Sequence, residues 1–105
     1  MDVNRRLQVQ RAAQVDLKVA FQWYESQDCG LGERLLASME AAFRRIEENP
    51  QMYPIRFGSI RRTLVDTFPY GIYFSIGETS IVVHAIYHTS RNPNLLRSRL
   101  RKDSP

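Results

Sequence analysis

The stretch DCGLG, residues Asp28 to Gly32, decides how the first half of this chain folds. It contains two of the five glycines in the sequence, and glycine accepts the positive φ angles at which helices end and chains turn. Helical periodicity runs up to this stretch and resumes after it. We therefore predict that residues 28–32 form a turn joining two helices into a hairpin.

The helix before this turn is predicted to begin at Ala12. Its apolar residues fall on one helical stripe, made by Ala13, Leu17, Ala20, Phe21 and Tyr24. Trp23 extends this stripe at an angle, and we expect Trp23 and Tyr24 to face the core. Ahead of the helix, apolar and polar residues alternate from Leu7 to Arg11, which predicts a short strand with one buried face.

The helix after the turn has a second apolar stripe, made by Leu35, Leu36, Met39, Phe43 and Ile46. Asn49 and Pro50 end this helix, because proline disfavours helical geometry in the preceding residue and has no N–H to donate. Burying one large apolar side chain contributes roughly 1.5 to 3 kcal/mol. Both stripes are therefore expected to cover a common apolar surface.

The second half of the chain supplies that surface. Ile60 to Val65, Ile72 to Ile76 and Ile81 to Tyr87 are rich in β-branched and aromatic residues, and they predict three consecutive antiparallel strands. Both alternating sets of the last run are largely apolar, as in a central strand covered on both faces. The tail from Asn94 to Lys102 is basic and can form a short amphipathic helix.

The predicted fold is thus a single α+β domain over residues 1–105. It has an N-terminal strand, a helical hairpin packed on one sheet, a three-stranded meander and a basic C-terminal tail or helix. The chain has 105 residues and 43% hydrophobic content, enough for one modest core. No apolar run approaches the roughly 20 residues of a membrane span, and the start lacks a secretory signal, so we expect a cytoplasmic protein.

The side-chain inventory argues against a metal or cofactor site. Cys29 is the only cysteine, and His84 and His88 are the only histidines, which leaves no disulfide framework and too few ligands for zinc. The net charge is +4, and all basic residues except Lys18 and Lys102 are arginines. Arginine suits phosphate or an acidic protein partner, although a solvated basic surface explains the same composition.

The order and spacing of several short motifs resemble the ParE/RelE toxin superfamily, and they lie closer to its ParE side. The match runs from about Leu7 to Pro93. The motifs that carry it are Asp16-Leu17, Trp23-Tyr24, Gly30-Leu31-Gly32-Glu33-Arg34, Ile46, Asn49-Pro50, Tyr53-Pro54, Arg61, Phe68-Pro69-Tyr70, Ala85-Ile86-Tyr87-His88 and Arg91-Asn92-Pro93. The resemblance implies the toxin of a type II toxin-antitoxin module, neutralised by a cognate antitoxin.

The resemblance also implies one of two targets, DNA gyrase for a ParE-like toxin or messenger RNA on the ribosome for a RelE-like ribonuclease. Metal-free RNA cleavage needs an acid, a base and cations around the phosphate, and the candidates are His88, Tyr87, Arg61 and Arg91. Tyr87 and His88 are neighbours on a strand, so their side chains should point to opposite faces. The RelE pattern uses lysines in the sheet region, and this chain has none there. We therefore favour gyrase binding over catalysis.

The expected partner-binding residues are arginines of the second half, namely Arg61, Arg62, Arg91, Arg97, Arg99 and Arg101. The antitoxin is expected to be an acidic, partly disordered segment that folds along a hydrophobic and basic surface. Simpler structural roles exist: His88 can fix the turn after its strand, His84 can pack in the core, and 91–93 can form a turn. A nontoxic binding domain of the same fold is the third hypothesis.

Overall fold

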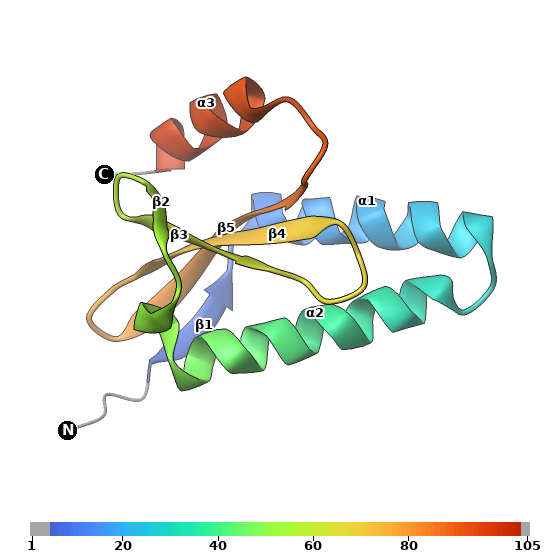
Figure 1. Ribbon diagram of the computed structural model, residues 1–105, viewed down its shortest axis with the longest axis horizontal. Coiled ribbons are helices and arrows are strands. Elements are labelled where there is room, and N and C mark those ends of the chain that lie inside the picture. The colour runs from blue at the N-terminus through green and yellow to red at the C-terminus, as the bar shows by residue number, and fades with distance from the viewer. Residues whose placement is uncertain (1–4, 104–105) are drawn as a thin grey trace.

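The computed structural model describes residues 5–103, which form one five-stranded sheet with helices on both faces (Figure 1). The elements are β1 (Arg6–Val9), α1 (Arg11–Gln27), α2 (Leu31–Glu48), the 3₁₀ turn η1 (Pro50–Met52), β2 (Ile55–Phe57), β3 (Ile60–Leu64), β4 (Tyr70–Ile76), β5 (Ser80–His88) and α3 (Pro93–Asp103). The α1–α2 hairpin covers one face, and α3 covers the other. No helix in this described part is long and apolar enough to cross a membrane.

The strands lie in the order β1-β5-β4-β3-β2. β3, β4 and β5 form the predicted antiparallel meander, and β5 lies inside the sheet as expected. β1 pairs with β5 in parallel, because the chain leaves the sheet through the helical hairpin and the meander before it returns beside its start. Two boundaries were wrong or missed: Arg11 begins α1 instead of ending the first strand, and β2 was not predicted.

The turn between α1 and α2 needs both of its glycines. Gly30 has a φ of 91°, which favours glycine, and a Cβ on Gly32 would lie 2.8 Å from the Phe21 ring. The Glu25 carboxylate accepts hydrogen bonds from the backbone N–H groups of Gly30, at 3.2 and 3.0 Å, and of Gly32, at 3.0 Å. The hydrogen bonds from Gly30, which have the largest effect, and the bond from Gly32 lower the pKa of the Glu25 carboxyl group. The turn was predicted from the sequence, whereas the Glu25 cap was not.

The core under the hairpin contains most of the residues predicted from the helical stripes, but Phe21 and Leu36 lie outside it. Leu35, Met39 and Ile46 are fully buried, and Tyr24 packs at the edge of the same cluster. The prediction that Trp23 faces the core was wrong. Its side chain is 56% exposed, and its ring meets the Tyr24 ring edge to face at a centroid distance of 4.9 Å. Its angle around α1 carries it past the sheet, so the aromatic side chain ends on the outer surface of the helix.

A bulge at His84 explains why both alternating sets of β5 are apolar. Tyr73 pairs with Ala85 and Phe74 with Val83, so His84 is the extra residue between them. Val83 and Ile86 therefore both pack toward the hairpin, while Ala85 and Tyr87 pack toward α3. His84 is 4% exposed, and its Nε2 lies 2.8 Å from the Ser75 hydroxyl. The predicted packing role of His84 is confirmed.

The predicted amphipathic tail is the helix α3. Leu96 and Leu100 are buried against Ile60, Tyr73 and Tyr87, and these residues form a second core on the face opposite the hairpin. Leu95 is exposed on the outer side of α3.

Candidate functional site

Arg99, one of the expected partner-binding residues, makes contacts inside the fold. Its guanidinium donates to both carboxylate oxygens of Asp16, at 2.9 and 2.7 Å, and to the carbonyl of His84 at 2.9 Å. The Oδ2 of Asp16, which accepts one of these hydrogen bonds, also accepts the Ile86 N–H at 2.9 Å. The ion pair of Asp16 and Arg99 therefore connects α1, α3 and β5, and we call it the Asp16–Arg99 junction. The expected solvated role was wrong for Arg99, and its contact with the antitoxin stays a prediction.

Arg61 also makes internal contacts. Its guanidinium donates to the Tyr53 carbonyl at 2.7 Å and to the Gln51 carbonyl at 3.3 Å, which holds the segment between η1 and β2 against β3. Arg61 is not among the residues that line the hollow described next. The structure therefore separates it from the other residues of the expected catalytic set.

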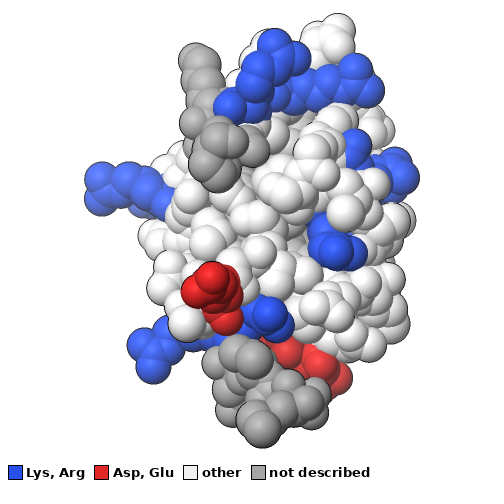
Figure 2. Space-filling model, turned by 90° about the vertical axis from the view of Figure 1, so that its left-hand side faces the viewer, with Lys and Arg blue, Asp and Glu red and all other residues white. Residues whose placement is uncertain are grey.

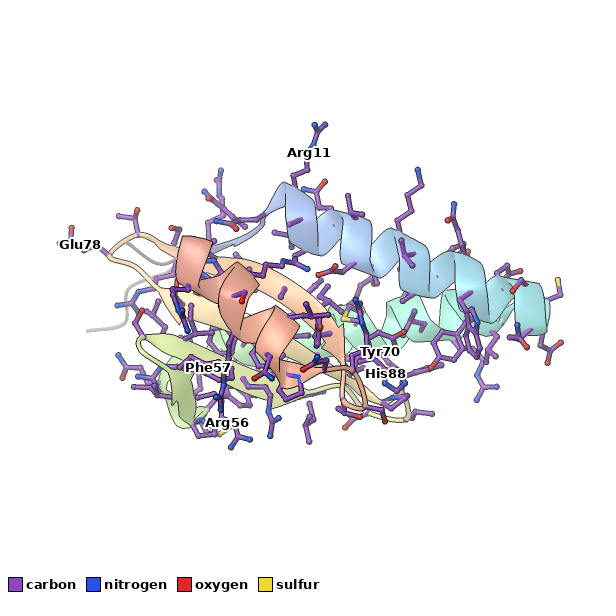
Figure 3. The ribbon with its side chains drawn as sticks, turned by 90° about the horizontal axis from the view of Figure 1, so that it is seen from above. Arg11, Arg56, Phe57, Tyr70, Glu78 and His88 are labelled. Carbon is purple, nitrogen blue, oxygen red and sulfur yellow. The ribbon has the colours of Figure 1, made fainter. Side chains whose placement is uncertain are left out.

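Four arginines from four parts of the chain line one hollow of about 230 Å³. They are Arg56 on β2, Arg62 on β3, Arg91 in the loop after β5, and Arg97 on α3, and we call the site the arginine hollow. Its walls also include Phe57, Tyr73, Tyr87, His88 and Thr89. In Figure 3, the labelled Arg56 and Phe57 lie on one side of α3, and the labelled His88 lies on the other. Arg101 lines a different hollow beside Phe57.

Aromatic rings and one glycine set the positions of these arginines. The guanidinium carbon of Arg91 lies 4.6 Å from the Tyr87 ring centroid, and that of Arg97 lies 5.3 Å from the Phe57 centroid. A Cβ on Gly71 would come within 3.2 Å of the Arg62 Cδ, so the Arg62 stem crosses β4 where no side chain stands. Packing thus shapes the hollow: the guanidinium groups of Arg91 and Arg97 lie on aromatic rings, and Gly71 leaves room for the aliphatic part of Arg62.

Tyr87 and His88 reach the hollow from opposite faces of β5. The Tyr87 ring belongs to the α3 core, and its hydroxyl donates to the Asn92 carbonyl at 3.1 Å. The His88 ring meets Tyr70 edge to face at 5.2 Å, and its Nδ1 accepts the Ser90 N–H at 3.0 Å. The expected opposite orientation and the expected turn-fixing role of His88 are confirmed. Both residues nevertheless line the hollow, because β5 ends there.

An exposed apolar stripe runs along α1, and the sequence analysis missed it. Val15, Val19 and Trp23 are 53%, 59% and 56% exposed, and their spacing of four places them on one line of the helix. The exposed Arg11 and Lys18 lie beside Val15 around a shallow depression. We call these five residues the α1 stripe. The repeat of apolar residues at every fourth position was a readable signal, but Trp23 had been assigned to the core.

Basic and acidic side chains are distributed unevenly on one face of the molecule. On the face shown in Figure 2, basic side chains are spread over the surface, whereas acidic ones are confined to its lower part. Among residues 5–103, no three histidine, cysteine, aspartate or glutamate side chains gather as a metal site would require. Cys29 is exposed at the hairpin turn. The arginine hollow and the α1 stripe thus offer cationic and exposed apolar groups.

Comparisons with known proteins agree with this architecture. The family model described as "ParE toxin of type II toxin-antitoxin system, parDE" matches residues 7–93. A solved structure described as the chromosomal ParDE toxin-antitoxin system from P. aeruginosa superposes with a TM-score of 0.75. That match covers 83% of this chain and 98% of the other at 13% sequence identity, so it concerns the fold. A search of curated protein sequences found no match.

Proposed function

Because the chain belongs to the ParE toxin family of type II toxin-antitoxin systems, we propose that it arrests growth by binding DNA gyrase and that an acidic antitoxin neutralises it. The observation that carries this proposal is the continuous family match, which spans β1, the hairpin, the whole sheet and the loop to α3. Docking, unlike catalysis, needs exposed anchors and charge, and the described surface offers both.

The internal contacts of the candidate catalytic residues favour docking over RNA cleavage. Arg61 donates to the Tyr53 carbonyl and lies outside the hollow, and the Tyr87 hydroxyl donates to a backbone carbonyl. His88 uses Nδ1 to fix its own turn. Each internal contact competes with the proton transfer or charge stabilisation that cleavage would ask of that group.

The gyrase proposal is tested with the purified chain in a DNA supercoiling assay. We expect inhibition that rises with the ratio of toxin to gyrase and disappears when the cognate antitoxin is added. Full supercoiling at a large molar excess of a folded chain would remove gyrase as the target. Normal growth after induction without the antitoxin gene would favour a nontoxic binding domain.

The α1 stripe is the surface we assign to the antitoxin. Three large apolar side chains lie exposed in line, with two cations beside them, which suits an amphipathic helix carrying acidic residues at its rim. Truncating Trp23 and Val19 together to alanine should weaken antitoxin binding at least tenfold, because aromatic anchors dominate such interfaces. Leu64→Ala, at a similarly exposed position on β3, is the control, and an equal loss there would contradict the assignment.

Ribonuclease activity is the second candidate, favoured by one observation: Tyr87, His88 and Arg91 line the same hollow. Mapping messenger RNA ends after induction tests it. If the hollow cleaves RNA, new ends should appear and His88→Ala should remove them. Absence of new ends in growth-arrested cells would leave gyrase binding as the better account.

A further inference from the structure

The arginine hollow differs from the ion pairs of Arg45 and Arg99 in having no carboxylate among its described residues. No aspartate or glutamate is found among the described residues that line it, although four arginines do. Elsewhere Arg45 pairs with Asp66 at 3.3 Å and Arg99 with Asp16 at 2.7 Å. Asp16 lies in a neighbouring depression that also touches His88 and Arg91, but both of its oxygens already accept hydrogen bonds. The gathered positive charge therefore lacks an anion from the chain's own described residues.

We propose that the arginine hollow binds the phosphates of a single-stranded nucleic acid. The proposal goes beyond gyrase docking and antitoxin binding, because neither requires a nucleic-acid contact, and it concerns the hollow in which the ribonuclease candidate would act. It concerns binding only and involves no cleavage step.

The stacked arginines are prepared for phosphate. A guanidinium that lies over a ring uses its face, and its N–H donors remain directed outward in its plane, where they match the two free oxygens of a phosphodiester. Arg91 on Tyr87 and Arg97 on Phe57 both have this arrangement. The ring contacts also restrict both side chains before a ligand arrives, which lowers the entropy lost on binding.

The remaining walls favour a strand over an isolated anion. The first turn of α3 contributes Pro93, Leu96 and Arg97, so the positive end of that helix dipole lies at the hollow. His88 is a half-buried ring at its wall, and such a ring can stack on a nucleic-acid base. An acidic peptide would use the cations but would make no use of this ring.

The test is fluorescence anisotropy with the purified full chain and labelled 12-nucleotide single strands of DNA and RNA of one sequence. The double variant Arg62→Gln with Arg91→Gln should weaken binding at least tenfold. Each lost phosphate contact should also lower the slope of log affinity against log salt by roughly 0.7 for single strands. Arg44→Gln, an exposed arginine of α2, is the matched control and should change affinity less than twofold.

A variant that leaves all arginines in place tests the built geometry. Gly71→Ala puts a methyl group 3.2 Å from the Arg62 Cδ and so displaces that stem. We expect a loss of about two- to fivefold with unchanged thermal unfolding. If the double variant does not fold, Arg56→Gln replaces it in the test, because the Arg56 side chain is exposed. This variant should also weaken binding.

Three results would overturn the proposal. Equal losses for Arg44→Gln and the hollow variants would mean that diffuse charge binds the strand. Displacement by inorganic phosphate or a nucleoside monophosphate at the concentration of the unlabelled strand would mean that the site takes a single phosphate. Equal competition by an acidic peptide would mean that it takes carboxylates. A preference for DNA or RNA identifies which strand the hollow takes, and neither result depends on the supercoiling assay.

Discussion

The Asp16–Arg99 junction and the arginine hollow use the same residue type for opposite purposes. At the junction, one guanidinium meets one carboxylate in a two-point contact between α1 and α3, and the charge is neutralised inside the fold. In the hollow, four guanidiniums line about 230 Å³ with aromatic rings and no described carboxylate. The role of an arginine therefore follows from the group that the fold places opposite it, and substitutions at the two sites test this difference.

The largest expected effect comes from removing the carboxylate of the junction. Asp16→Ala leaves a half-buried guanidinium and the Ile86 N–H without their acceptor, and we expect a loss of about 2 to 4 kcal/mol in unfolding free energy. Urea denaturation measures it. The double variant Asp16→Ala with Arg99→Met should recover part of the loss, because the uncompensated cation is then gone. An additive loss would show that the pair does not couple.

The converse change places a carboxylate in the hollow. Thr89→Asp supplies an anion at the wall next to four arginines, so the hollow becomes similar to the junction. We expect oligonucleotide affinity to fall about tenfold, since the introduced charge repels phosphate and competes for the same donors. Stability should change by less than about 1 kcal/mol, as for exposed pairs. The control is Thr89→Asn, which should leave affinity within twofold of the original chain.

Glu25 extends the comparison to a carboxylate held by backbone N–H groups. The hydrogen bonds from Gly30 and then Gly32 lower its pKa below the ordinary value of 4.5, so folding favours the charged form. Its stabilising contribution is present above the unfolded pKa and is lost as the pH falls through the lowered, folded pKa. Glu25→Gln should therefore destabilise the chain at pH 7 and reduce the decline of its melting temperature with acid. An unchanged acid profile would contradict this cap.

The smallest effect is expected at the surface pair of Arg45 and Asp66. The Asp66 side chain is 77% exposed and the two groups are 3.3 Å apart. Solvent and salt screen such a pair, so Arg45→Ala should cost less than about 1 kcal/mol, most of it lost in high salt. Thermal unfolding at two ionic strengths measures it. A loss as large as that of Asp16→Ala would erase the distinction between the junction and the surface.

Much of the fold could be predicted because it depends on local patterns. The DCGLG turn, the two helical stripes and the three β-branched runs each report a side-chain period, and the helices and the meander follow from them. The strand β2 escaped prediction because its three residues are too few to show alternation. Trp23 was misassigned because an aromatic residue near an apolar stripe reads as core, whereas only the packed helix shows which angles the sheet covers.

The site was predicted in part. The sequence named Arg62, Arg91 and Arg97 as contact residues and His88 as the residue that fixes its turn, but it did not include Arg56, and it assigned Arg99 to the surface. Arg97 and Arg99 are two positions apart on one helix and have the same chemistry. The neighbouring sequence does not distinguish them, because Arg97 lies over the Phe57 ring and Arg99 binds the Asp16 carboxylate, and both partners are distant in sequence.

By itself, the sequence determined the order of the helices and most strands, the basic surface and the family, because these follow from neighbouring residues and from motifs in a line. Only the tertiary structure decided which arginines are neutralised inside the fold and which gather around a hollow. The reason is distance along the chain: Asp16 and Arg99 are 83 residues apart, and the hollow joins β2, β3, the loop after β5 and α3. Side-chain periodicity reports the direction of a side chain and not the group that it meets.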